Sequence, residues 1–574
     1  MLLGPTVFRA LRSLWTIGGT AGIIVTSLTT LRLGQLTLTL DLIIKLLITF
    51  AYTHGFTNIL SRSRKSNCSQ LDHPEEHLTI LEQTDNPASY NERLPDIPLC
   101  RNQQIIATVV GWREDEDLYR KCLEGFAADQ SCGPLIAGID GDTAEDEDMV
   151  KIFLSMFPFG TVIQLDELLS QTLEQYMLSA NLTDVEDEQT CAYIMEHISS
   201  FIRGVLEEAI PSRSIKDVQA LCIVQPHQSK KEILFTTLCF AGVVAHELSI
   251  PYLFSTDSDS AIVPGALRKM IESLEGDDNI GGVSGHLRFR NPRPTYLTRM
   301  TASFYWFEQQ IPKIQGAMFG ATECQPGPCA AFRVSVLKLV LVPWYCQRTC
   351  GHKTIINEDR HLTTRVLWAG FTVHYAPGAI VYTDAPETFD AWVRQQVRWS
   401  RGTMIETLWY PWMINRLSPW HIYSIIKARG APLLTFWSLT HYALGSQSGM
   451  PAFRSIFLVD IFCSTALQVT YLVHMSPDQP THSDIVWLLP SILWFTFVSP
   501  GIVVWSLLTI WDDSWGNVPR AISCRNFAKN KVNGGLFSSE VFQRAFKMRS
   551  VGFQIVWMEI VLIAAVRALY SLIV

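Results

Sequence analysis

The sequence predicts an α/β domain with a largely parallel sheet, embedded in a multi-pass α-helical membrane protein. Between about residues 100 and 400, short apolar runs alternate with helical patterns. Apolar segments of membrane-spanning length flank this region on both sides. Only 17% of the 574 residues are charged and 48% are hydrophobic, which fits a membrane protein with a substantial polar part.

Charge and cysteine usage narrow the classes of function. The net charge of −8 favours no nucleic-acid partner. The thirteen cysteines are scattered without a CxxC framework, which indicates reduced thiols in the cytosol. Two apolar segments, at about 14–33 and 36–60, are preceded and followed by basic residues. By the positive-inside rule both flanks, and the α/β domain that follows, are expected in the cytoplasm of a cell-membrane protein.

Four further apolar segments follow the α/β region, at about 431–444, 454–475, 485–511 and 551–574. The third contains Pro490, Pro500 and Gly501, and a basic stretch follows it at 511–550. If the third segment spanned the membrane, simple alternation would place those cations outside. We therefore expect an in-plane or re-entrant segment there, with 511–550 remaining cytoplasmic.

The predicted organisation follows from these boundaries. It comprises two transmembrane helices at 1–65, a polar linker at 66–98, the α/β domain at 99–388, interfacial helices at 389–428, and a C-terminal transmembrane and re-entrant region at 429–574.

Polar groups follow the predicted strands of the α/β domain. The strands are expected at 105–110, 135–139, 218–224 and 250–254. Ligands of parallel sheets bind at the carboxyl ends of the strands, so the residues after each strand are candidates for binding. The acidic clusters found there are Gly111-Trp112-Arg113-Glu114-Asp115, Asp140-Gly141-Asp142 and Asp257-Ser258-Asp259.

Asp257 and Asp259 have the spacing of metal-binding carboxylates. In an extended backbone, residues two apart project to the same side and can meet one cation. Mg²⁺ or Mn²⁺ typically bridges one or two carboxylates to substrate phosphates. Acidic turns are common, so the pair alone also fits a solvated turn.

Further motifs supply a candidate base and candidate cations. Asp359, beside Arg360, can remain ionised and act as a general base, although Asn357 and the acids also fit an ordinary helix start. Lys230-Lys231 could supply cations that bind a diphosphate, and the pattern also fits an ordinary pair of solvated lysines. At the membrane boundary, Gln395–Trp399 combines a cation with a flat ring, which suits an anionic leaving group and a sugar.

The order of these motifs resembles the processive family 2 glycosyltransferases, most of all hyaluronan synthases and their fungal relatives. The stretches that carry the resemblance are GWREDEDLYRKCL at 111–123, IDGD at 139–142, QPHQSKKE at 225–232, STDSDS at 255–260, GPCAAFR at 327–333, NEDRHLTTR at 357–365 and YTDAPETFDAWVRQQVRWSRG at 382–402. The resemblance implies a GT-A (Rossmann-like) cytosolic domain. It also implies inverting transfer from a UDP-sugar to a growing polysaccharide, an extracellular or cell-wall polymer that is exported through the lipid bilayer.

The resemblance also implies roles for individual residues. UDP-sugar binding is expected from Gly111, Trp112, Glu114, Asp140, Lys230, Asp257 and Arg398. Asp257 and Asp259 would hold Mg²⁺ or Mn²⁺, and Asp359 matches the catalytic base. The acceptor is expected at Gln395, Gln396, Trp399, Gly327 and Pro328, near Cys324, and Trp515 belongs to a gating loop.

Departures from the family pattern stand at Cys329–Arg333, at Trp515-Gly516-Asn517 and at His227-Gln228-Ser229, and one C-terminal spanning segment is missing. We expected these changes to cluster around the acceptor and the gate, so the identity of the polymer is not carried over. The alternatives are a chitin synthase-like enzyme, a non-processive transferase, and an inactive membrane scaffold or transporter. The Gln395-Gln396 pair and the intact acidic positions favour a processive synthase over these three alternatives.

Overall fold

The computed structural model describes residues 46–50, 104–210, 214–349, 351–411, 413, 417–445, 455–475, 481–512 and 539–573. Residues 46–50 are helical. The rest of the predicted N-terminal membrane region, the polar linker and the loop of Trp515 lie outside the described residues, so these predictions stay untested.

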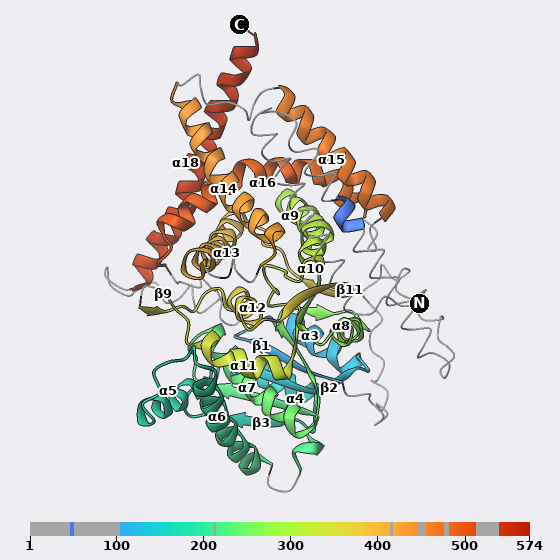
Figure 1. Ribbon diagram of the computed structural model, residues 1–574, viewed down its shortest axis with the longest axis vertical. Coiled ribbons are helices and arrows are strands. Elements are labelled where there is room, and N and C mark those ends of the chain that lie inside the picture. The colour runs from blue at the N-terminus through green and yellow to red at the C-terminus, as the bar shows by residue number, and fades with distance from the viewer. Residues whose placement is uncertain are drawn as a thin grey trace.

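A nine-stranded mixed sheet forms the centre of the α/β domain (Figure 1). The order of its strands is β3-β4-β2-β1-β5-β8-β7-β11-β6. The block from β3 to β5 is parallel throughout, and β8 runs antiparallel between β5 and β7. The predicted α/β architecture with a largely parallel sheet is thereby confirmed.

The strands are β1 (Ile105–Gly111), β2 (Cys132–Asp140), β3 (Thr161–Gln164), β4 (Ala220–Gln225), β5 (Tyr252–Asp257), β6 (Ala261–Ile262), β7 (Ile280–Phe289), β8 (Ala330–Arg333) and β11 (Thr372–Thr383), with a separate hairpin of β9 (Arg348–Thr349) and β10 (His352–Lys353). The four apolar runs predicted as strands correspond to β1, β2, β4 and β5. The strands after β5 were not predicted.

The helices of the α/β domain are α3 (Glu116–Ala128), α4 (Glu147–Met156), α5 (Leu169–Ser179), α6 (Glu188–Ala209), α7 (Lys230–Glu247), α8 (Ala266–Glu275), α9 (Tyr296–Glu308), α10 (Ile314–Met318), α11 (Val334–Tyr345) and α12 (Glu358–Trp368). Short helical turns, η1 (Ile215–Asp217) and η2 (Gln309–Lys313), complete this part of the chain.

Helices cover both faces of the sheet. Alternate residues of β1 point to opposite sides, so Ile106 packs with α6, α7 and α11, whereas Ile105 packs with α3, α4 and α8. Both side chains are fully buried, as expected for a strand in the middle of a parallel block. The two apolar layers hold the carboxyl ends of β1, β2, β4 and β5 at one edge of the domain.

The acidic composition of 165–210 predicts a solvated helical excursion. It is helical, but the expectation of a fully solvated segment is wrong for α6. Ile194, Ile198, Ile202 and Leu206 recur every four residues and are fully buried in the core. The charged residues that dominate the composition of this stretch lie on the opposite face of the helix.

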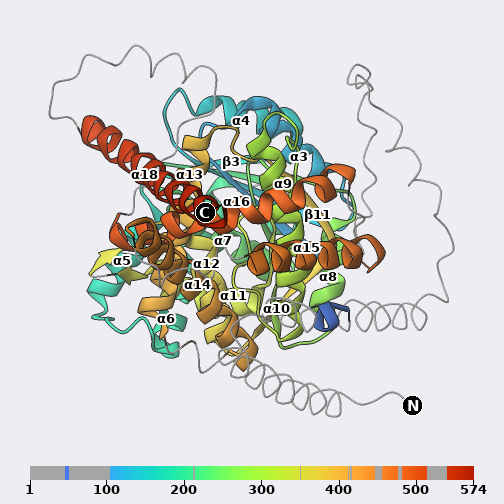
Figure 2. The same ribbon diagram turned by 90° about the horizontal axis from the view of Figure 1, so that it is seen from above.

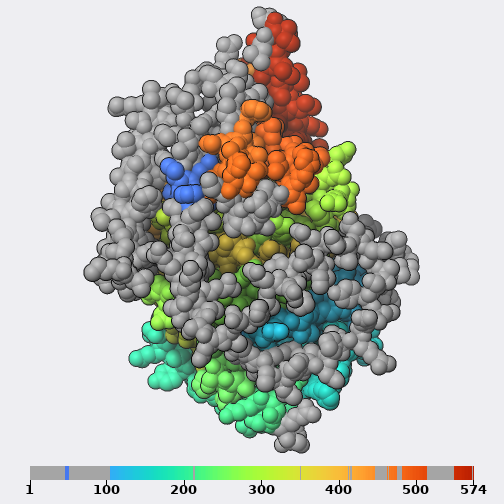
Figure 3. Space-filling view, turned by 90° about the vertical axis from the view of Figure 1, so that its right-hand side faces the viewer, coloured from blue at the N-terminus to red at the C-terminus, as the bar shows by residue number. Residues whose placement is uncertain are grey.

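The C-terminal helices form the other end of the molecule (Figure 3). They are α13 (Phe389–Trp409), α14 (Pro419–Ala443), α15 (Ser455–Met475), α16 (His482–Leu508) and α18 (Ser539–Ile573). Helix α13 packs on α16 through Trp392, Val397 and Phe495. Seen from above, α15 lies beside α16 (Figure 2), and Leu472 and Leu488 share one apolar cluster between them.

Two helices among the described residues are long and apolar enough to cross a membrane, His482–Leu508 and Arg549–Ser571. The first is a single continuous helix that contains Pro490 and Pro500. Its backbone does not fold back on itself between these prolines. Helix α16 lies crosswise to α18 in Figure 1, so the in-plane alternative stays a prediction.

Candidate functional site

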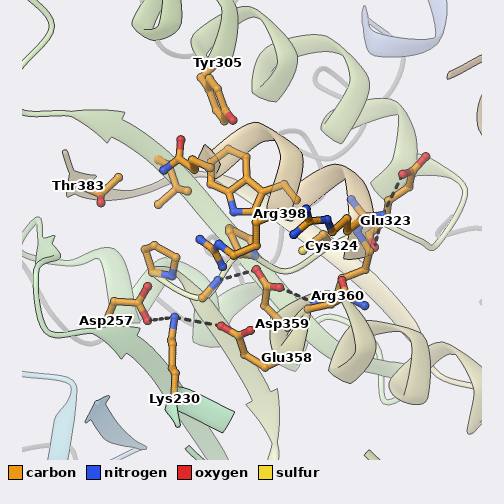
Figure 4. Close-up of a pocket in the computed structure, with 18 of the residues that line it drawn as sticks. Lys230, Asp257, Tyr305, Glu323, Cys324, Glu358, Asp359, Arg360, Thr383 and Arg398 are labelled. Atoms are coloured by element: carbon orange, nitrogen blue, oxygen red, sulfur yellow. Dashed lines mark hydrogen bonds and ion pairs between the residues drawn. The ribbon is translucent and has the colours of Figure 1, made fainter. Parts of the chain in front are cut away.

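A cavity of about 1620 Å³ lies at the carboxyl ends of the strands, between the sheet and helices α9, α12, α13 and α14. Every predicted site residue whose position the structure describes lines it, except Gln396. The cavity therefore gathers the motifs that the chain order had separated by almost 300 residues (Figure 4).

One side of the cavity, where the sequence predicts the nucleoside, is formed by residues that follow β1 and β2. The indole of Trp112 stacks on the imidazole of His227 with ring centroids 4.1 Å apart. The Nε1 atom of Trp112 is buried and has no hydrogen-bond partner among the described residues, so a ligand could accept from it. Ser258 Oγ donates to Glu114 Oε2 at 3.3 Å, which ties the ends of β1 and β5 together.

Asp140 organises the loop that carries the lysine motif. Its Oδ2 atom lies 2.8 Å from His227 Nδ1, and its Oδ1 atom accepts from the backbone N–H of Gln228 at 3.1 Å. The hydrogen bond with Asp140 raises the pKa of His227. His227 thus lies beside Trp112 and Asp140, two of the residues predicted to bind the UDP-sugar.

Lys230 contacts both the end of β5 and the start of α12, which carries Asp359. Its Nζ atom lies 2.6 Å from Asp257 Oδ1 and 3.2 Å from Glu358 Oε1, as Figure 4 shows. Ser229 caps helix α7 by accepting from Glu232 N, and this cap places Lys230 at the first position of the helix. A solvated lysine pair is excluded, because Lys231 is also buried.

Gly327 lies beside this ion pair, and its lack of a side chain leaves space there. A Cβ atom on Gly327 would lie 3.1 Å from Lys230 Nζ and 3.3 Å from Asp257 Oδ2. The predicted Gly327-Pro328 turn therefore lies between the Lys230–Asp257 ion pair and Asp359.

Burial raises the pKa of Asp257, with Lys230 opposing and Asp259 adding to the rise. A divalent cation would relieve this repulsion between neighbouring carboxylates, so Asp257 and Asp259 fit one chemically. No group of three His, Cys, Asp or Glu side chains able to hold a metal ion occurs in the described part of the chain. This donor set suits Mg²⁺ or Mn²⁺, which takes the rest of its ligands from phosphates and water.

Asp359 faces the cavity from the first turn of α12. Its Oδ2 atom accepts from the backbone N–H of Gly327 at 3.3 Å, and its Oδ1 atom accepts from its neighbour Arg360 N at 2.7 Å. Burial raises the pKa of the Cys324 thiol, and the nearby Asp359 adds to the rise, so Cys324 stays protonated. The carboxylate is held by two donors and is open to the cavity.

Helix α13 forms the opposite wall. Gln395, Arg398 and Trp399 are spaced three and four residues apart, so they share one face of the helix and line the cavity. Gln396 points elsewhere, and its Nε2 atom donates to Tyr305 Oη at 3.3 Å. The ring of Tyr305 meets Trp399 edge-on at 5.9 Å. Gln396 therefore supports the aromatic pair and does not line the site.

Charged residues from three further elements line the same cavity and were missed by the sequence reasoning. Glu323 Oε2 contacts Arg360 at 3.1 Å and Arg429 at 2.6 Å. Burial opposes ionisation of Glu323, but the two guanidinium groups outweigh it and lower its pKa to about 2. Burial and the nearby Glu323 raise the pKa of Glu308, on α9, to about 7. These residues lie in stretches without a recognisable motif, so only their charge could have marked them.

Glu358, the neighbour of Asp359, carries no predicted role of its own but makes contacts that organise the start of α12. Its carboxylate is buried and contacts Lys230, and its backbone oxygen accepts from Trp344 Nε1 at 2.7 Å. Burial raises the pKa of Glu358, while Lys230 and Arg398 oppose the rise. The two neighbouring acids therefore differ in their surroundings. Glu358 is buried and holds the start of the helix through its contacts, whereas Asp359 faces the cavity.

Known glycosyltransferases are similar to this chain in sequence. Residues 253–508 match the family model described as "Glycosyl transferase family group 2". Hyaluronan synthase 3 from Xenopus laevis is 25% identical over 429 residues, covering 74% of this chain and 69% of that protein. Hyaluronan synthase 3 from Homo sapiens is 24% identical over 437 residues, covering 75% and 72%.

A solved structure of a mannosyltransferase, PcManGT from Pyrobaculum calidifontis in complex with GDP-Man and Mn²⁺, aligns over 92% of this chain and 99% of that chain. The TM-score is 0.32 and the identity is 13%, which is too remote a likeness to support an argument about function.

Replacing Lys230 with Met tests the ion pair that joins the two halves of the site. Removing the ammonium leaves Asp257 and Glu358 facing each other without a cation, which we expect to cost about 3–5 kcal/mol of stability. Thermal melting of the purified protein measures this loss. As a control, Lys151→Met removes an exposed lysine that pairs only with acids on its own helix, and should leave the melting temperature unchanged.

Proposed function

We propose that this chain, which is similar to family 2 glycosyltransferases and to hyaluronan synthases, is a membrane-embedded synthase. It would transfer a sugar from a UDP-sugar donor to a growing polysaccharide, with inversion. The observation that carries the proposal is the meeting of Asp257, Asp359 and the Arg398-Trp399 pair in one cavity. An inactive scaffold or transporter would have no need to keep a base, a cation and a paired carboxylate together.

The donor is proposed to bind along the ends of β1, β2 and β5. Gly111, Trp112, Glu114 and Asp140 would hold the nucleoside, with the indole supplying an apolar face. Lys230 would meet the diphosphate, and its existing ion pairs keep the ammonium charged and oriented. Asp257 and Asp259 would hold a divalent cation, which when bound supplies positive charge for the departing diphosphate.

Asp359 is proposed as the general base. In an inverting transfer it takes the proton from the acceptor hydroxyl while that oxygen forms a bond to the anomeric carbon and the bond to UDP breaks. Arg398 lies close enough to oppose the rise in the pKa of Glu358, so its charge reaches the same region. We propose that this charge stabilises the diphosphate as it leaves.

The acceptor is proposed to lie between Trp399 and the turn at Gly327-Pro328. The Trp399 ring is 39% exposed and faces a cavity, so it can offer a flat surface to a sugar. Gln395 lies on the same helix face and would donate or accept hydrogen bonds there. Trp515, proposed for the gate, lies outside the described residues.

The position of α13 supports the proposal that this region lies at the bilayer. This helix carries Arg398 and Trp399 and packs on α16, one of the two helices apolar enough to cross a membrane. We propose that 389–428 lies at the cytoplasmic interface of the cell membrane and that the polymer passes from Trp399 into the region 429–574. The α/β domain at 99–388 would then be cytoplasmic and would receive UDP-sugars there.

The donor screen tests the function as a whole. Purified protein in lipid nanodiscs is mixed with Mg²⁺ or Mn²⁺ and with UDP-GlcNAc, UDP-GlcA or UDP-Glc, singly and in pairs, and UDP release and polymer length are measured. We expect turnover with at least one donor or pair, and products longer than a single transfer. Short products bound to lipid would instead favour a non-processive transferase, and a folded protein that releases no UDP would contradict the proposal.

Replacing Asp359 with Asn separates catalysis from binding. We expect the kcat for transfer to fall by about 10²–10⁴-fold, because the amide cannot accept the proton. The Kd for UDP, measured by calorimetry, should change little, because the proposed nucleoside contacts lie on other strands. Equal loss of transfer and of UDP binding would identify Asp359 as structural.

Replacing Trp399 with Ala tests the acceptor platform. We expect polymer length and the elongation rate to fall by about tenfold, which corresponds to the loss of one ring-stacking contact. The KM for the UDP-sugar should stay near the wild-type value. The opposite pattern, with a raised donor KM and normal elongation, would remove Trp399 from the acceptor site. Phe at this position serves as the matched control, since it keeps an apolar ring.

A further inference from the structure

A buried carboxylate lies behind the cavity, outside every motif that the proposed reaction uses. Glu406 belongs to α13, about two helical turns beyond Arg398. Its side chain is nearly fully buried. Burial of an unpaired carboxylate is costly, so the partners of Glu406 indicate what it does.

Three side chains from two other segments donate to one oxygen of Glu406. The Oε1 atom lies 2.8 Å from Asn357 Nδ2, 3.0 Å from Gln347 Nε2 and 2.9 Å from His361 Nδ1. Asn357 and His361 flank Asp359 at the start of α12, whereas Gln347 follows α11. One carboxylate therefore joins the helix of the proposed base to the helix of Arg398 and Trp399.

The protonation state of this cluster follows from its hydrogen bonds. Arg365 Nε donates to His361 Nε2 at 3.1 Å, so that nitrogen carries a lone pair and the proton resides on Nδ1, facing Glu406. Burial lowers the pKa of His361 to about 4, so the ring is neutral near pH 7. Arg365 is itself held by Glu186 at 2.6 and 2.8 Å.

The two helices also approach each other closely at this point. A Cβ atom on Gly402 would lie 2.5 Å from Asn357 Oδ1, so only glycine allows the contact. Asn357 itself has a φ of 76°, and its side chain makes no capping hydrogen bond with α12. The predicted helix start at Asn357 is correct in place, but the amide bonds to α13 and does not cap the helix.

The cluster continues to the donor side. Gln347 Oε1 accepts from Lys231 Nζ at 3.3 Å, and Lys231 is the neighbour of Lys230 on α7. Lys231 Nζ also donates to the backbone oxygen of Thr354 at 2.9 Å, just before α12. Glu406 is thus connected through one amide to the helix that supplies the proposed diphosphate cation.

We propose that Glu406 is a positioning residue that sets the separation between Asp359 and the Arg398-Trp399 pair. This inference rests on the proposed function for those three residues, and Glu406 itself lines no part of the cavity. Its role is to accept hydrogen bonds at Oε1, since Oε2 has no hydrogen-bond partner among the described residues. The position of the hydrogen-bonding oxygen of Glu406 therefore matters more than the charge of its carboxylate.

Two substitutions separate positioning from charge. Glu406→Gln keeps an oxygen at the Oε1 position, and we expect it to retain most of the wild-type kcat for UDP release and polymer synthesis. Glu406→Leu removes the acceptor, and we expect kcat to fall by about 10- to 100-fold, because a displacement of the order of 1 Å has that effect on a reaction between positioned groups. The KM for the UDP-sugar should stay near the wild-type value in both variants.

Hydrogen exchange supplies a readout that does not depend on turnover. In Glu406→Leu the amides of 355–368 and 395–409 should exchange faster, while those of β1, β2 and β5 stay protected. Glu272→Leu, at a partly exposed acid that pairs with Arg268 on its own helix, is the matched control and should change neither readout. If wild-type protein turned over no UDP-sugar, the exchange result would still decide whether Glu406 couples the two helices.

Three outcomes would overturn the inference. Normal kcat in Glu406→Leu would show that the contacts do not position the site. Equal loss in Glu406→Gln and Glu406→Leu would show that the charge matters and not the acceptor geometry. Faster exchange throughout the sheet, with kcat and KM failing together, would make Glu406 a residue of general stability only.

Discussion

The contact of Lys230 with both Asp257 and Glu358 is the interaction on which the arrangement of the site depends. It joins the end of β5 to the start of α12, two elements that are 100 residues apart in the chain. Two buried carboxylates without a cation would repel each other and would take up protons. With the ammonium between them they remain close, and the donor residues and the proposed base share one floor. The turn at Gly327 passes close beside this contact, and a Cβ atom there would lie 3.1 Å from Lys230 Nζ, so a side chain would press on the ion pair.

Helix α13 forms one wall of the cavity with one of its faces and packs against other helices with the others. Arg398 and Trp399 face the cavity, whereas Trp392 and Val397 pack on α16. The helix cannot shift toward or away from the base without disturbing an apolar contact on one side and the hydrogen bonds of Glu406 on the other. A wall held on two sides suits a reaction that must keep a leaving group and a sugar at fixed distances from Asp359.

The sequence could predict the strands and the acidic groups after them, because buried parallel strands are apolar runs and their ends carry the ligands. It could not predict the strands from β6 onward, which are short, irregular or partly exposed. The motif order marked Asp257, Asp359 and Arg398, but it could not assign Gln396 to a helix face or separate the tasks of Glu358 and Asp359. Those assignments depend on helix rotation and on distant partners such as Tyr305 and Lys230.

The residues that the motifs did not mark are also those most able to distinguish one product from another. The groups that bind a nucleoside diphosphate and remove a proton serve any transfer of this class, so they contain little information about the sugar. Glu308, Glu323 and Arg429 line the same cavity from α9, the loop before β8 and α14. Glu323 is held ionised between Arg360 and Arg429, whereas the pKa of Glu308, about 7, lets its charge change near neutrality. A sugar that reached this wall would meet charged groups whose positions are set by three elements outside the shared motifs, and selectivity for the polymer would follow from them.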